Sequence, residues 1–116
     1  MDKLQVSARF PNIKRNNLDE FKKLAAEMLE ITKGEPGTLQ YDYFLNSDET
    51  VCMVRETYTN SDAHMAHVAG MGDRLARLME LGGGLVDAEV FGSPSSAHIE
   101  AFADFKPTVY SYLQGL

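Results

Sequence analysis

The chain has 116 residues, a single-domain length, and with 44% hydrophobic and 24% charged residues it is typical of a globular protein that buries one core. A net charge of −6, with no basic cluster longer than Lys14-Arg15, argues against binding to nucleic acid. The lone Cys52 excludes an intrachain disulfide, and neither a signal-peptide pattern nor an apolar run of about 20 residues is present, so we expect a cytoplasmic protein without a membrane span.

The first part of the chain predicts a strand followed by a helix. Residues 4–10 alternate between apolar and polar side chains, which is the pattern of a half-buried strand. Apolar residues then recur every three or four positions over residues 18–32, so we expect an amphipathic helix there, capped by Asn16 or Asn17. Gly and Pro in residues 34–37 end this helix.

A hairpin follows the first helix. Residues 38–45 and 50–58 favour strands, and the polar cluster at 46–49 predicts the turn between them. An odd-numbered turn would reverse the faces of one strand relative to the other. With an even-numbered turn, one face carries Leu39, Tyr41, Tyr43, Cys52, Val54, Glu56 and Tyr58.

The second half of the chain predicts another helix and another strand. Asn60 or Ser61 caps a helical segment that glycines at 70–72 interrupt and glycines at 82–84 end. Residues 85–91 alternate as a fourth strand, a short helical segment follows at 97–104, and the tail at 108–113 favours a strand.

This order of elements, βαββαβ, predicts an α+β fold of the ferredoxin-like type, with one antiparallel four-stranded sheet and both helices on one face. We expect a single domain over residues 1–116, with a core at 3–92 and a C-terminal extension at 93–116. The uncovered sheet face would carry Phe44 and Met53, which are too apolar to face water as a large patch. A second copy of the chain is the simplest cover, so we expect a homodimer.

Two stretches resemble a known family. Pro36-Gly-Thr-Leu-Gln-Tyr41 and the longer run from Val54 to His67 are similar to the antibiotic biosynthesis monooxygenase domain, and the resemblance covers residues 4–91. It implies a dimeric α+β barrel. Well-studied members oxygenate quinols or polyketide-like aromatics without flavin, haem or metal, so the resemblance implies O₂ as co-substrate and no cofactor.

The resemblance also assigns residues. The family histidine corresponds to His67, whereas His64 matches no family position. The Trp that usually ends the third strand is Tyr58 here, and the chain contains no Trp. Haem degradation, which uses that Trp in related members, is therefore not expected.

The spacing of His64 and His67 also suits a shared metal ion, because residues three apart project from one helix face. Zinc needs three or four protein ligands, and neither His98 nor Cys52 stands at a ligand-like spacing, so we expect no metal site. Met65 and Val68 mark the buried stripe of this helix, which predicts that His64 lies on the surface. His67 either packs against the sheet or takes a proton at a cavity edge.

The sequence therefore predicts a cofactor-independent monooxygenase acting on a small phenol, hydroquinone or polyketide-like aromatic. His67 is the predicted catalytic residue, and Tyr58, Tyr41, Tyr43 and Arg55 are the predicted substrate-binding residues. A non-catalytic dimeric protein that binds a small molecule, and an isomerase or cyclase on the same fold, are the alternatives.

Overall fold

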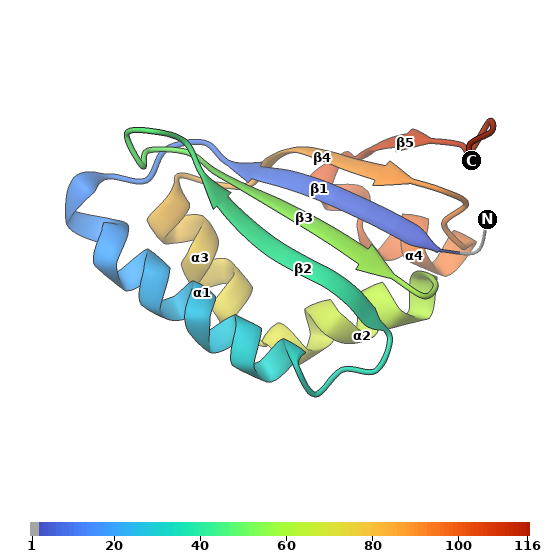
Figure 1. Cartoon of the computed structure of the whole chain (residues 1–116), viewed down its shortest axis with the longest axis horizontal. Coiled ribbons are helices and arrows are strands. Elements are labelled where there is room, and N and C mark those ends of the chain that lie inside the picture. The colour runs from blue at the N-terminus through green and yellow to red at the C-terminus, as the bar shows by residue number, and fades with distance from the viewer. Residues whose placement is uncertain (1–2) are drawn as a thin grey trace.

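The computed structural model describes residues 3–116 and contains one sheet with helices packed against it (Figure 1). The strands and helices are β1 (Leu4–Phe10), α1 (Leu18–Thr32), β2 (Thr38–Leu45), β3 (Cys52–Tyr58), α2 (Ser61–Met71), α3 (Arg74–Gly82), β4 (Val86–Phe91), α4 (Ser96–Ala101) and β5 (Thr108–Tyr110). Two short 3₁₀ turns, η1 (Arg15–Asn17) and η2 (Ala103–Phe105), precede α1 and β5.

The strands form a sheet in the order β2-β3-β1-β4-β5. The β2–β3, β1–β3 and β1–β4 pairs are antiparallel, which confirms the ferredoxin-like βαββαβ arrangement. The sheet is larger than expected, because the C-terminal tail adds β5 as a fifth strand parallel to β4. The tail therefore belongs to the same sheet as the core.

Helices α1, α2 and α3 lie on one face of the sheet (Figure 1). The side chains that alternate toward them form the core, for example Phe10, Cys52 and Val54, each at most 4% exposed. The hairpin register sets Tyr41 opposite Glu56 and Tyr43 opposite Val54, which confirms the face predicted from an even-numbered turn. Leu39 is the exception to that face: the pairing shifts at this position and its side chain is 50% exposed.

The helix ends follow local chemistry only in part. The side chain of Asn60 accepts a hydrogen bond from the Ala63 amide and caps α2, as predicted. Asn17 makes no such bond, because it closes η1 with helical backbone angles and its side chain is not placed to cap α1. Gly72 separates α2 from α3 with a positive φ of 57°, a conformation that glycine adopts without strain.

The opposite face of the sheet carries no helix in the described residues (Figure 1). Phe44 on this face is 51% exposed, and a shallow groove beside it includes Gln40, Met53, Arg55 and Phe91. No helix in residues 3–116 is long and apolar enough to cross a membrane.

Candidate active site

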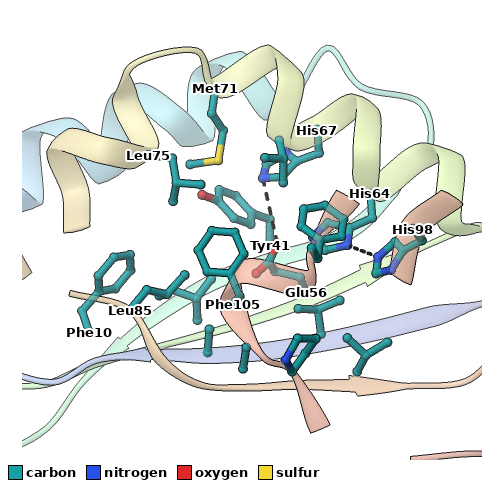
Figure 2. A pocket seen from close by; sticks show the side chains of 18 of the residues that line it. Phe10, Tyr41, Glu56, His64, His67, Met71, Leu75, Leu85, His98 and Phe105 are labelled. Atoms are coloured by element: carbon teal, nitrogen blue, oxygen red, sulfur yellow. Dashed lines mark hydrogen bonds and ion pairs between the residues drawn. The ribbon is translucent and has the colours of Figure 1, made fainter. Parts of the chain in front are cut away.

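A cavity of about 80 Å³ lies between the sheet and the helices (Figure 2). Its walls come from the inner face of β1–β4, from α2 and α3, and from the C-terminal segment that contains α4 and η2. Most of the lining is apolar. The polar side chains among the lining residues are Tyr41, Tyr43, Glu56, His64, His67 and His98, and none of the described lining residues is Lys or Arg.

His67 is the most distinctive group in this cavity. Its side chain is 1% exposed, and its Nδ1–H donates a hydrogen bond to Oε1 of Glu35 at 2.7 Å. Because a carboxylate accepts at Nδ1, the neutral ring carries its proton there and Nε2 is a bare acceptor. Nε2 is the one enclosed side-chain nitrogen or oxygen in residues 3–116 that has no hydrogen-bonding partner. Such an atom is costly to bury and marks a place for a ligand proton.

The turn after α1 brings Glu35 to His67. A Cβ atom at Gly37 would lie 2.6 Å from Cβ of Ala63, so only glycine lets this turn pack directly against α2. The Oγ1–H of Thr38 also donates to Oε1 of Glu35, at 2.9 Å, which fixes the carboxylate. Sequence reasoning assigned these residues to a turn and missed the carboxylate, although Glu35 directly precedes the Pro36–Tyr41 stretch that carries the resemblance.

Glu56 faces His67 from the sheet. Its Oε1 lies 3.9 Å from Nε2 of His67 and accepts a hydrogen bond from the Tyr58 hydroxyl. Burial raises the pKa of the Glu56 carboxyl above its ordinary value, and this outweighs the opposing effects of the Tyr58 bond and of His67. A carboxyl with a raised pKa holds its proton more firmly than usual, so Glu56 can act as an acid beside the nitrogen of His67.

Tyr58 packs behind the residues that line the cavity. Its side chain is fully buried, donates to Glu56, and stacks on His64 with ring centroids 4.6 Å apart. Burial and the neighbouring Glu56 raise the pKa of Tyr58, so its hydroxyl remains protonated. The structure therefore places Tyr58 against the lining residues Glu56, His64 and His67 and not among the lining itself.

Tyr41 and Tyr43 line the cavity together. Their hydroxyls share a hydrogen bond, and the Tyr41 ring lies edge-on to His67 at a centroid distance of 4.6 Å. Burial raises the pKa of both phenols, which keeps them neutral. They are thus hydrogen-bonding groups beside the bare Nε2 of His67.

Arg55 lies on the other side of the sheet. It is exposed, pairs in register with Asp42, and borders the outer groove. The structure thus brings His67, Tyr41 and Tyr43 together and separates Arg55 from them.

The surface position predicted for His64 is wrong. The ring is 6% exposed and lies between Tyr58 and Phe102, stacked on Phe102 at 4.5 Å. Its Nδ1 is 2.8 Å from Nε2 of His98, which comes from α4 and is 2% exposed. Burial, followed by the nearby His98 and His67, lowers the pKa of His64 to about 3. The C-terminal segment covers a helix face that the pattern within α2 marks as solvent-facing.

These groups can move protons in a dry site. His67 offers a bare nitrogen, the Glu35 carboxylate stabilises the imidazolium that forms when this nitrogen takes a proton, and Glu56 offers a proton back. The apolar walls exclude water, which strengthens each of these interactions.

Known structures share this fold. MupZ from Pseudomonas fluorescens aligns with a TM-score of 0.83 over 100% of this chain and 94% of its own, at 23% identity. Rv0793 from Mycobacterium tuberculosis aligns with a TM-score of 0.61 over 83% of this chain and 99% of its own, at 22% identity. SnoaB, a cofactor-independent oxygenase from Streptomyces nogalater, aligns with a TM-score of 0.61 over 83% of this chain and 97% of its own, at 16% identity.

The sequence itself gives the family. No curated protein sequence matches the chain. The family model described as antibiotic biosynthesis monooxygenase matches residues 5–71, which include Glu35, Glu56 and His67. With the predicted order of elements present in the structure, the chain belongs to the antibiotic biosynthesis monooxygenase family.

Proposed function

We propose that the chain is a cofactor-independent monooxygenase that oxidises a small phenol, hydroquinone or polyketide-like aromatic with O₂. Family membership and the description of SnoaB support oxygenation without a cofactor. The observation that carries the proposal is the enclosed, unpartnered Nε2 of His67 in an apolar cavity, held by Glu35. It is the group that a phenolic or enolic proton would reach.

In this mechanism the substrate supplies the electrons. His67 Nε2 takes the proton of the substrate hydroxyl, and the Glu35 carboxylate stabilises the imidazolium. The substrate anion passes an electron to O₂, and recombination forms a substrate peroxide, which takes the proton back from His67. His67 then removes the C–H proton at the peroxide carbon, the electron pair of that bond forms C=O as the O–O bond breaks, and Glu56 donates a proton to the leaving oxygen. One oxygen atom stays in the product, the other leaves as water, and the proton on His67 restores the acid form of Glu56.

The neutral phenols have a separate task. Tyr41 stands beside His67, and one of the two hydroxyl protons of Tyr41 and Tyr43 lies in the bond between them. The other proton can be donated to the developing oxyanion, which lowers the barrier to its formation. Because no Lys or Arg lines the cavity in the described residues, these neutral donors and the imidazolium are the stabilising groups.

Oxygen uptake tests the proposal. The wild-type protein, free of metal and flavin, should consume O₂ with members of a hydroquinone and phenol panel. His67→Ala removes the proton acceptor and should abolish this uptake while the protein remains folded by circular dichroism. Equal rates in the two proteins would remove His67 from the mechanism. Binding without turnover in air would favour a non-catalytic binding protein.

An isomerase or cyclase is the second candidate, and a separate observation favours it. The Glu56 carboxyl, whose pKa is raised by burial, stands 3.9 Å from Nε2 of His67, and an acid beside a base can move a proton between two positions of one substrate without O₂. Product formation that persists under argon would select this candidate.

We also propose that the chain acts as a homodimer through the outer sheet face. Phe44 is 51% exposed there and the face lacks a helical cover in the described residues. Phe44→Glu would place a charge in this interface and should give monomers in light scattering. Glu30→Gln, at an exposed position of α1, is the control and should leave the dimer intact. A monomeric wild-type protein would contradict the proposal.

A further inference from the structure

Besides His67, Glu56 and the Tyr41–Tyr43 pair, one more polar group lines the cavity: the two rings of His64 and His98. Their bond at 2.8 Å joins Nδ1 of His64 to Nε2 of His98, so Nε2 of His64 and Nδ1 of His98 lie outside this bond. Both residues line the cavity. Figure 2 shows the two rings side by side with the bond between them, on the same side of the cavity as Glu56.

The rings are held rigidly. His64 is stacked on one side by Tyr58 and on the other by Phe102, with centroid distances of 4.6 and 4.5 Å. The His98 ring contacts Phe102 as well, at 4.5 Å. Rings that cannot rotate present their nitrogens in fixed directions, so a ligand does not have to order them on binding.

The number of protons decides what the pair can bind. Burial lowers the pKa of both histidines, so the two neutral rings share two protons over four nitrogens. One proton lies in the bond between the rings. The two remaining nitrogens, Nε2 of His64 and Nδ1 of His98, are therefore one donor and one acceptor, and they exchange these functions when both rings change tautomer.

A pair of rings with one free donor and one free acceptor favours a neutral hydroxyl as its ligand. A hydroxyl donates and accepts and fits either tautomer, whereas a carboxylate or phosphate would need a cation, and none of the described lining residues supplies one. We propose that the His64–His98 pair is a second substrate-binding site. It binds a neutral hydroxyl of the substrate other than the hydroxyl that gives its proton to His67. The proposal rests on the proposed function, since it concerns the same cavity and substrate.

This site extends the substrate class. The substrate is an uncharged, mostly apolar molecule with two hydroxyl groups, of the hydroquinone type, and not a monophenol or an aromatic acid. Half of the site comes from α4, beyond residues 5–71, which the family model matches. The C-terminal segment is thus a part of the binding site and distinguishes this chain's substrate from those of relatives that lack it.

The proposal is tested with two ligands of similar size, hydroquinone and 4-methylphenol. In 4-methylphenol a methyl group stands in place of one hydroxyl of hydroquinone. Dissociation constants are measured by calorimetry without oxygen, so that no turnover occurs. The wild-type protein should prefer hydroquinone about fivefold, the effect of one neutral hydrogen bond. His98→Leu should abolish the preference, and His98→Gln, which keeps a donor and an acceptor, should retain most of it.

Nitrogen NMR on the wild-type protein provides a result that does not depend on a variant folding. Hydroquinone should shift the ring ¹⁵N signals of His64 and His98, and 4-methylphenol should leave them near their free positions. No preference in the wild-type protein, the same preference in His98→Leu, or unshifted ¹⁵N signals would each overturn the proposal. The test is separate from the proposed function. Selective binding of hydroquinone without O₂ uptake would support this site and contradict the proposed oxygenase activity.

Discussion

Glu35→Gln is the most informative single substitution, because it removes the charge next to His67 while it keeps the size and shape of the side chain. The amide has the shape of the carboxylate, and its oxygen can still accept from Thr38. What is lost is the negative charge that lies 2.7 Å from Nδ1 of a histidine that is 1% exposed. Glutamine can also donate to Nδ1, which would leave the proton on Nε2 and remove the bare acceptor.

The expected loss follows from the strength of that contact. A buried hydrogen bond to a charged group contributes about 1.5–3 kcal/mol, and here it acts on the imidazolium that forms only when the substrate proton is transferred. The rate constant kcat should therefore fall about 10- to 100-fold, with a much smaller change in KM.

Oxygen uptake with the best substrate of the hydroquinone panel measures this loss. Glu30→Gln is the matched control, since Glu30 is an exposed glutamate on α1 that pairs with Lys33 far from the cavity. The ¹⁵N signals of His67 should show Nδ1–H in the wild-type protein and a larger share of Nε2–H in Glu35→Gln. A Glu35→Gln enzyme within about twofold of the wild-type kcat, with the same tautomer, would refute the assignment of Glu35 as a positioning residue.

Three further variants have defined outcomes. Glu56→Gln should be more stable than the wild-type protein above pH 4.5, and the difference in Tm should grow with pH. The raised pKa of the Glu56 carboxyl makes the folded protein hold a proton that the unfolded chain releases. A difference in Tm that does not change with pH would contradict the buried acid. His64→Phe keeps the stacking but removes the titrating ring. Between pH 6.5 and pH 4 the wild-type protein should therefore lose about 3 kcal/mol more free energy of unfolding than the variant, as measured by urea titrations. An equal loss in the two proteins would contradict the low pKa of His64. Phe105→Ala should widen the cavity from about 80 Å³ and improve the affinity for 1-naphthol relative to phenol, because the Phe105 ring lines the cavity and its removal makes room for a second aromatic ring; unchanged relative affinity would show that Phe105 does not limit ligand size.

The periodic patterns predicted the fold well because they record local burial. The stripe over α1 and the alternation over β1 fall on the observed elements, and the even-numbered turn gave the correct face for Tyr41 and Tyr43. The cap at Asn17 was predicted from residue type alone. A preceding 3₁₀ turn gives this residue helical angles, and that turn is not visible in the pattern.

Strand alternation placed Tyr41 and Tyr43 on the cavity face, whereas on the helices only the resemblance pointed to a cavity residue. His67 was identified by the family histidine, but its partner Glu35 is 32 positions away and the two meet only through tertiary packing. The buried stripe predicted for α2, Met65 and Val68, is wrong: both are only half-buried, and the helix buries His64, His67 and Met71 instead. Because His64 flanks the predicted stripe, local periodicity placed it in solvent. It is buried because His98 and Phe102, more than 30 positions later, pack over it. A pattern confined to one helix cannot contain that contact.

Isotope labelling tests the central claim most directly. The protein, free of metal and flavin, is supplied with its best hydroquinone-type substrate under ¹⁸O₂, and the product is analysed by mass spectrometry. The account predicts one ¹⁸O atom in each product molecule from the wild-type protein and no labelled product from His67→Ala. Unlabelled product, or labelled product formed equally by His67→Ala, would contradict it.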